Sequence, residues 1–517
     1  MVDERWAPCL GQGCFESFAE RFSGNLMGIL KIATYWSALE RFGSQGVQFL
    51  ILIVLARLLS PQDFGLIGML AVFCCLGEVF ADCGLATVLI QRPANSADDE
   101  STAFYLNVGA GALFAVFLCA VSPWVAGFFG QPILLPMLCV MSLQVLFSSL
   151  GIIQASLMSR AMDFRRQAII NTVSTLFSGC LGIGMALSGF GVWSLAGQFV
   201  TAAMVRSLLF WKFGRWRPSG SFNSASLRAI WSFSSKLLLS NLITSAFENI
   251  YSVFIGRIYP PAELGYYTRA TSFSQFFPLL VTSIFGRTSF AAFARMQDDI
   301  DLLKSSARKV FRLFAAVHFP VMAGLAVTAG PLVTCLVTDK WAPCVPYLRI
   351  LAIMGMLYPF NRLHLNLIVA KGRSDLFLKL EGIKNVLTIL VLLSTFKFGV
   401  FGIVLGRLGC QIVCLACSGY YVHKVIRYTW AEQLTDIITA IINISLMVCA
   451  VQLPYICKNS GIALHFLNLK TPLTLLFVQV TIGLLVYGTL ATISKNTAYV
   501  DLRSQVSSIW HSLRIRL

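Results

Sequence analysis

Apolar runs of membrane-spanning length recur along most of the chain, and they limit what it can fold into. About 20 apolar residues are enough for a helix to cross a hydrocarbon core of about 30 Å, and runs of this length alternate with short polar joints. The sequence therefore predicts an all-α polytopic membrane protein with about 12 to 14 transmembrane helices. The predicted spans are 35–58, 64–90, 103–128, 133–158, 168–188, 191–212, 230–257, 266–290, 311–337, 345–370, 377–397, 400–422, 434–456 and 472–494.

The composition agrees with a membrane location. Apolar residues make up 57% of the 517 positions and charged residues 12%, whereas soluble domains carry about 25% charged residues. No hydrophilic stretch reaches the roughly 50 residues that a small soluble domain needs. These values exclude a disordered chain, a secreted disulfide scaffold and a single soluble catalytic domain.

The excess of basic residues indicates how the chain is oriented in the membrane, and it does not indicate nucleic-acid binding. The 40 Lys and Arg residues exceed the 23 Asp and Glu residues, which gives a net charge of +17. They concentrate in alternate loops, for example 160–166 and 212–228, and the positive-inside rule places such loops in the cytoplasm. The first residues lack the basic and apolar regions of a signal peptide. We therefore expect a multi-pass protein of the cell membrane with both termini cytoplasmic.

A repeated motif divides the chain into two halves. Arg57, Pro61 and Gly65 have the same spacing as Arg257, Pro261 and Gly265, and an acid lies between the Pro and the Gly of each copy. Six predicted spans separate the copies, so both run in the same direction through the membrane. Parallel six-helix halves around a central cavity occur among secondary transporters. The expected organisation is a cytoplasmic tail (1–34), an N-lobe (35–228), a C-lobe (229–430), two further helices (431–494) and a basic tail (495–517).

Two acids in one predicted span are candidates for ion coupling. Glu78 and Asp82 are four residues apart and so share one helix face. Ionisable groups at bilayer depth are costly and mark functional sites. Two neighbouring carboxylates raise the pKa of one of them, which suits a group that loads and releases a proton near neutral pH. Pairing of either acid with a cation such as Arg41 is the structural alternative. Glu248 is a third coupling candidate.

Three cations are candidates for substrate binding. Arg41, Lys236 and Arg407 would give a cavity between the halves a positive lining that suits a phosphate or pyrophosphate. Other span cations lie close enough to helix ends for their charges to reach the headgroups. This second group consists of Arg57, Arg206, Arg257, Arg287 and Arg349.

The sequence contains no motif that predicts a bound cofactor or metal. The chain has no Walker motif and no GxGxxG motif. Its CxxC, from Cys414 to Cys417, lies in an apolar run without a second ligand pair, so we expect no metal there. The sequence predicts neither a catalytic residue nor a cofactor.

Two segments near the start resemble a known family. Residues 36–46 read WSALERFGSQG and residues 55–66 read LARLLSPQDFGL. They resemble the bacterial polysaccharide exporters of the multidrug/oligosaccharidyl-lipid/polysaccharide superfamily, with the colanic-acid exporter branch nearest. Further matches lie at 89–92, 190–195, 216–218, 265–270, 294–299 and 372–379.

The resemblance implies a carrier and not an enzyme. Such exporters move undecaprenyl-pyrophosphate-linked oligosaccharide repeat units from the cytoplasmic to the periplasmic leaflet of the inner membrane, for exopolysaccharide, capsule or O-antigen assembly. The expected partners are the lipid-linked oligosaccharide, membrane lipids, an H⁺ or Na⁺ gradient, and polymerase and chain-length-control proteins. The alternatives are a cation-coupled multidrug antiporter of the same superfamily and a lipid II flippase.

Overall fold

The computed structural model describes residues 43, 45–92, 95–214, 216–459 and 471–493, and these residues form helices and no β-strand. The N-half contains helix Gln45–Leu58, α2 (Pro61–Asp82), α3 (Leu85–Gln91), α4 (Ala97–Phe129), α5 (Leu134–Arg160), α6 (Phe164–Leu187) and α7 (Trp193–Phe213). The C-half contains α8 (Ser224–Ile258), α9 (Pro261–Arg295), α10 (Ile300–Val337), η2 (Asp339–Cys344), α11 (Val345–Ala370), α12 (Ser374–Thr395), η3 (Phe396–Phe398) and α13 (Gly399–Ile426). Helices α14 (Trp430–Asn459) and α15 (Pro472–Ile493) follow.

The all-α membrane fold is confirmed. Ten helical segments of the described chain are long and apolar enough to cross a membrane, and one of them, 374–426, includes both α12 and α13. Large apolar side chains such as Trp124 and Leu484 are more than 70% exposed on the outer surface, as expected where lipid is the solvent. The number of crossings, 12 to 14, stays a prediction.

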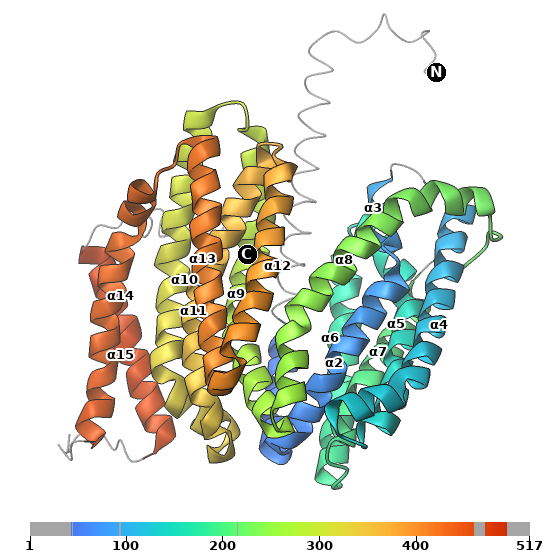
Figure 1. The fold of residues 1–517 in the computed structure, drawn as a ribbon, viewed down its shortest axis with the longest axis horizontal. Helices are drawn as coiled ribbons and strands as arrows, with labels where there is room; N and C mark the ends of the chain where they lie inside the picture. Colours follow the sequence, from blue (N-terminus) through green and yellow to red (C-terminus); the bar gives the residue numbers. More distant parts are fainter. Residues whose placement is uncertain (1–42, 44, 93–94, 215, 460–470, 494–517) are drawn as a thin grey trace, which may run out of the picture.

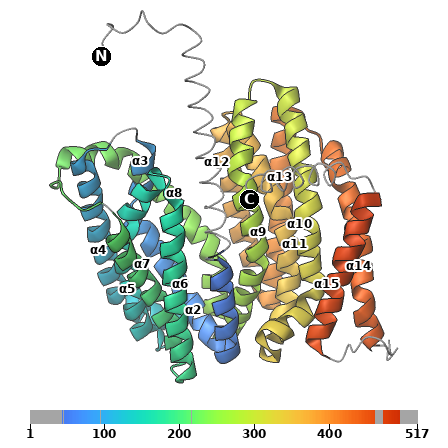
Figure 2. The ribbon, with the colours of Figure 1, turned by 180° about the vertical axis from the view of Figure 1, so that it is seen from behind.

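The two halves lie side by side, with α14 and α15 at the outer edge of the C-half (Figure 1). The view from behind shows the same order, with α14 and α15 at one edge of the molecule and the N-half at the other (Figure 2). Asp436 of α14 fixes this outer pair to α10, because Arg308 and Arg312 both donate hydrogen bonds to it at 2.6–2.9 Å. The buried hydroxyl of Tyr428 also donates to Asp436, at 2.8 Å.

The predicted span at 64–90 is two helices in the structure. The backbone turns between α2 and α3 at Cys83 and Gly84, which both have positive φ. A Cβ at Gly84 would lie 2.9 Å from the carbonyl oxygen of Ser234. Glycine therefore lets the backbone of α8 approach at this break.

Helix α8 contacts both halves. Near its start, Ile230 packs with Leu85 and Leu89 of α3 in an N-half cluster. Near its end, Ile255 belongs to a larger core that also contains residues of α2 and α9. Figure 1 shows α8 running obliquely across the molecule between these two regions. The lobe boundary at 228/229 stays a prediction.

The repeated turns meet at one end of the bundle. We call this the turn end, defined by the turns at 59–60 and 259–260. A Cβ at Gly65 would lie 1.7 Å from the carbonyl oxygen of Pro261, and a Cβ at Gly265 would lie 1.9 Å from that of Pro61. The two glycines thus let α2 and α9 cross in direct backbone contact. This reciprocal contact is the packing expected of two equivalent halves related by a pseudo-two-fold axis.

Candidate functional site

Side-chain hydrogen bonds close the turn end between the halves. Arg57 donates to the carbonyl oxygens of Leu336 at 2.7 Å and Cys335 at 2.6 Å, near the last residue of α10. Trp341 of η2 donates its indole N–H to the carbonyl oxygen of Ala56 at 2.8 Å. The ammonium of Lys340 donates to the carbonyl oxygen of Arg57 at 2.6 Å. The halves are therefore held together at this end.

Aromatic packing continues the contact away from the turns. The ring of Phe49 stacks on that of Phe276 of α9, with centroids 4.6 Å apart, and meets Phe273 edge-on at 5.6 Å. Figure 1 shows the ribbons of the halves close together at the turn end and further apart toward the opposite end. The arrangement resembles a transporter conformation closed on one side.

A cavity of about 590 Å³ lies in the C-half. Its walls come from α8, α9, α11, α12 and α13, and Cys75 of α2 reaches it from the N-half. Four acidic or basic side chains line it: Glu248, Glu381, Lys384 and Arg407. We call it the C-half cavity. The predicted residues Arg407 and Glu248 therefore lie in one cavity.

Arg407 is held by aromatic groups. Its guanidinium donates a hydrogen bond to the hydroxyl of Tyr267, and it lies 4.8 Å from the ring centroid of Tyr251. Across the described chain, no carboxylate forms an ion pair with it. A guanidinium positioned by neutral groups retains its charge for an anionic ligand.

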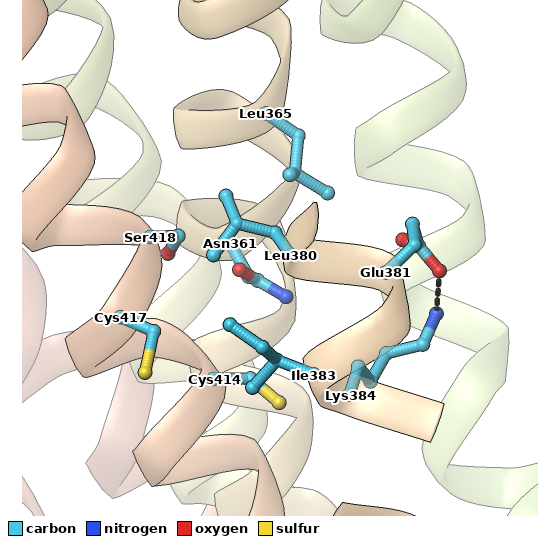
Figure 3. A pocket seen from close by; sticks show the side chains of 9 residues that line it. All are labelled: Asn361, Leu365, Leu380, Glu381, Ile383, Lys384, Cys414, Cys417 and Ser418. Atoms are coloured by element: carbon cyan, nitrogen blue, oxygen red, sulfur yellow. Dashed lines mark hydrogen bonds and ion pairs between the residues drawn. The ribbon is translucent and has the colours of Figure 1, made fainter. Parts of the chain in front are cut away.

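The structure adds an ion pair that the sequence did not suggest. Glu381 and Lys384 lie one turn apart on α12 and are paired. Figure 3 shows the pair at the edge of a side pocket, with Asn361 of α11 and Ser418 of α13 opposite. Lys384 lies inside the predicted span 377–397, and α12, which begins at Ser374, includes both charges. The Glu-x-x-Lys spacing was the available signal, because it places both charges on one helix face.

The structure does not place two of the predicted substrate-binding cations, Lys236 and Arg41, at this cavity. Lys236 is exposed on α8 and is not among the residues that line the C-half cavity. Arg41 lies outside the residues that the structure describes. A binding role for either one stays a prediction.

A second cavity, of about 400 Å³, lies in the N-half and is lined by Glu78, Asp82 and Arg206. We call it the N-half cavity. The predicted acidic pair therefore does face one common space. Glu78 accepts hydrogen bonds from the amide of Gln144 at 2.9 Å and from the hydroxyl of Ser148 at 3.4 Å.

The two acids are held differently. Asp82 accepts a hydrogen bond from the backbone N–H of Ala86 at 3.1 Å, so it caps the first turn of α3. Among the described residues, Glu78 accepts hydrogen bonds only from side chains, and Arg206 is linked to it through a 3.3 Å hydrogen bond to Ser148. Sequence reasoning placed Arg206 among the cations that reach the headgroups, whereas the structure brings it to the cavity wall.

The two cavities differ in charge. The N-half cavity has two carboxylates and one guanidinium, whereas the C-half cavity has two carboxylates and two cations. Since Glu381 and Lys384 neutralise each other, Arg407 is the main positive charge available in the C-half cavity. Among the described residues, no group of His, Cys, Asp and Glu is suited to hold a metal ion.

Comparisons with known proteins agree with this architecture. The family described as "Polysaccharide biosynthesis protein" matches residues 54–346. The chain is 28% identical to the lipopolysaccharide biosynthesis protein WzxC of Escherichia coli (strain K12), over 75% of this chain and 80% of that protein. It is 26% identical to the succinoglycan biosynthesis transport protein ExoT of Rhizobium meliloti (strain 1021), over 63% and 66% of the two chains.

Solved structures share the fold. The lipid II flippase MurJ, in an inward closed conformation, superposes with a TM-score of 0.67 at 15% identity and covers 91% of this chain and 99% of that one. An inward-facing multidrug resistance MATE transporter gives 0.58 at 14% identity, over 75% and 99%. The fold is thus shared with solved transporters, and the relative ExoT is itself named as a transport protein. This chain belongs to the polysaccharide biosynthesis protein family of membrane transporters.

Proposed function

We propose that this protein is an inner-membrane flippase for undecaprenyl-pyrophosphate-linked oligosaccharide repeat units. The observation that carries the proposal is Arg407, a guanidinium without a carboxylate partner in the described chain, on the wall of a 590 Å³ cavity. A pyrophosphate is a ligand that such a group binds well. WzxC and ExoT are named for polysaccharide biosynthesis and transport, which supports a substrate of this class.

The proposed mechanism is alternating access. The halves rock relative to each other, so that the crossing of α2 and α9 separates when the turn end opens. The C-half cavity holds the pyrophosphate, and the polyprenyl tail stays in the lipid. With both termini in the cytoplasm, the turn end faces the periplasm. The conformation described here is then closed toward the periplasm, which is the state expected to load substrate from the cytoplasmic leaflet.

The reset step is proposed to use an ion gradient. Glu78 is the favoured coupling acid because, within the described part of the chain, its hydrogen-bond donors are side chains, so it can change protonation state without breaking a helix cap. Asp82 is tied to the start of α3, which makes it a structural group in this scheme. H⁺ is the expected ion, and Na⁺ is the alternative.

Deletion of the gene in its native strain tests the proposal. Lipid-linked repeat units should accumulate on the cytoplasmic leaflet while surface polysaccharide disappears, and the wild-type gene should restore both. Arg407→Ala should lower the flipping rate about 10-fold to 100-fold, since a hydrogen bond to a charged group contributes about 1.5–3 kcal/mol. Arg349→Ala is the matched control, because Arg349 is exposed and lines neither cavity.

The other outcomes identify the alternatives. Unchanged polysaccharide with altered drug sensitivity would indicate the antiporter. Accumulated peptidoglycan precursor would indicate a lipid II flippase. Equal rates for Arg407→Ala and Arg349→Ala would remove Arg407 from the binding site.

A further inference from the structure

One arginine is buried in the contact between the halves. Arg269 of α9 is only 3% exposed. Its guanidinium lies 4.1 Å from the ring centroid of Phe64, on α2, and 5.6 Å from that of Trp341, on η2. The two rings themselves meet edge-on at 5.4 Å. The charge is therefore enclosed by aromatic side chains from both halves at the turn end.

The guanidinium has no anion beside it. Its Nε and Nη1 are buried without a hydrogen-bond acceptor, and no described carboxylate forms an ion pair with it. The acids of the two repeat motifs are engaged elsewhere. Asp63 accepts from Ser60 at the start of α2, and Glu263 accepts from the hydroxyl of Tyr347 at 2.7 Å.

An enclosed charge of this kind is unfavourable for the closed state. Removing a guanidinium from water costs more than contacts with two aromatic rings return, unless hydrogen bonds satisfy its N–H groups. Opening the turn end separates Phe64 from Trp341, because they belong to different halves. The opening would therefore give Arg269 access to water or to an anion.

Arg269 is also close to the transport route. Its neighbours Thr268 and Thr271 line the C-half cavity, and the hydroxyl of Thr271 is buried without a partner. Arg269 lies between these two threonines in the sequence, but its side chain points away from the cavity, toward Phe64 and Trp341 at the turn end. A ligand that leaves the cavity through this end passes the segment that carries Arg269.

We propose that Arg269 is a second pyrophosphate-binding group, hidden while the turn end is closed and exposed when it opens. The binding half of this inference rests on the proposed function. The buried charge lowers the stability of the closed state, and the anion that reaches the opened end stabilises the open state. Arg407 would bind the pyrophosphate on loading and Arg269 on release.

Spin labels across the turn end test the inference. Ser188→Cys lies in the α6–α7 turn of the N-half and Lys397→Cys in η3 of the C-half, and both positions are exposed. Electron–electron distance measurements in nanodiscs, with the native cysteines replaced, give the fraction of molecules with the turn end open. Each variant is measured without ligand and with undecaprenyl pyrophosphate, after its thermal unfolding has confirmed that it folds.

The sign of the change separates two roles of the charge. Arg269→Met removes the buried charge and should lower the open fraction at least about threefold, whereas Arg269→Lys buries a more strongly hydrated ammonium and should raise it by a similar factor. An open fraction that rises in Arg269→Met would overturn the inference, because the ring contacts would then be the main effect. An unchanged fraction in Arg269→Lys would overturn it as well.

The ligand arm separates this inference from the proposed function. Undecaprenyl pyrophosphate should raise the open fraction in the wild type and not in Arg269→Met. A response that is equal in both would refute Arg269 as a binding group. A wild type that does not bind the probe would instead refute the proposed substrate, and the ligand-free comparison would still decide the effect of the charge. Arg257→Met is the matched control, since Arg257 also lies over a ring, Phe128, but is exposed.

Discussion

Replacing Gly65 by alanine should open the contact between the halves. The new Cβ would lie 1.7 Å from the carbonyl oxygen and 2.5 Å from the carbonyl carbon of Pro261. Both atoms belong to the backbone at the start of α9, so no side-chain rotation can relieve the overlap. Ordinary contact begins near 3.4 Å, so α2 and α9 would have to separate by about 1.7 Å, the difference between the two distances.

The expected cost follows from this separation. Overpacking a well-packed site costs about 1–3 kcal/mol, and a clash with backbone belongs at the upper end of that range. About 3 kcal/mol changes a conformational equilibrium more than 100-fold. Because the clash exists only while the halves touch, we expect the turn end to open and the thermal unfolding temperature to fall by about 3 °C or more.

The assay combines thermal unfolding with the spin-label pair at 188 and 397. Gly265→Ala should act in the same way, because its Cβ would lie 1.9 Å from the carbonyl oxygen of Pro61. Gly184→Ala and Gly324→Ala are matched controls, one in each half, since nothing lies within 4 Å of a Cβ at either position. If Gly65→Ala behaved like these controls in both measurements, the direct crossing of α2 and α9 would be refuted.

Two further predictions concern the acids. Glu78→Gln keeps an oxygen that accepts hydrogen bonds from its neighbours but removes the charge. The increase in transport rate that an imposed pH gradient causes in proteoliposomes should therefore fall at least about tenfold. An increase as large as that of the wild type would exclude Glu78 as the coupling acid. Asp436→Asn leaves Arg308 and Arg312 without their shared carboxylate. Because both guanidiniums are partly exposed to water, we expect a moderate loss, a fall of about 2 kcal/mol in the unfolding free energy measured by denaturant titration. Exposed Asp375→Asn is the control for both variants, and an Asp436 variant as stable as this control would refute the role of the ion pairs in docking α14.

Helix positions were predictable because lipid leaves the backbone few choices. From 103 onward, each predicted span coincides with one helix. The exception, 64–90, contains no proline and is apolar apart from Glu78 and Asp82 and a few small residues, so its hydropathy does not reveal the break at Cys83 and Gly84. That break depends on the approach of the Ser234 backbone from α8, and such a contact between distant segments leaves no local pattern in the sequence.

The candidate sites were predictable in part. A central acid or cation in an apolar run is visible, which is why Glu78, Asp82 and Arg407 were found. Arg206 and Arg269 lie near span ends, where a cation can reach the headgroups along its own side chain. Their roles depend on which way the side chain points and on what the other half places beside it, and hydropathy contains neither piece of information.

The backbone of the two halves is more alike than their charges are. Gly65 and Gly265 make the same contact in both directions, but the position that corresponds to Arg269 at the same 200-residue offset is Met69, which is buried and uncharged. The reciprocal crossing gives both halves the same backbone contact while the turn end is closed. A buried charge on one half alone makes the two closed states unequal in free energy. We therefore expect the direction of transport to depend on such unmatched charges and not on the repeat itself, so that Met69→Arg should alter the balance between the two states while leaving the helix crossing intact.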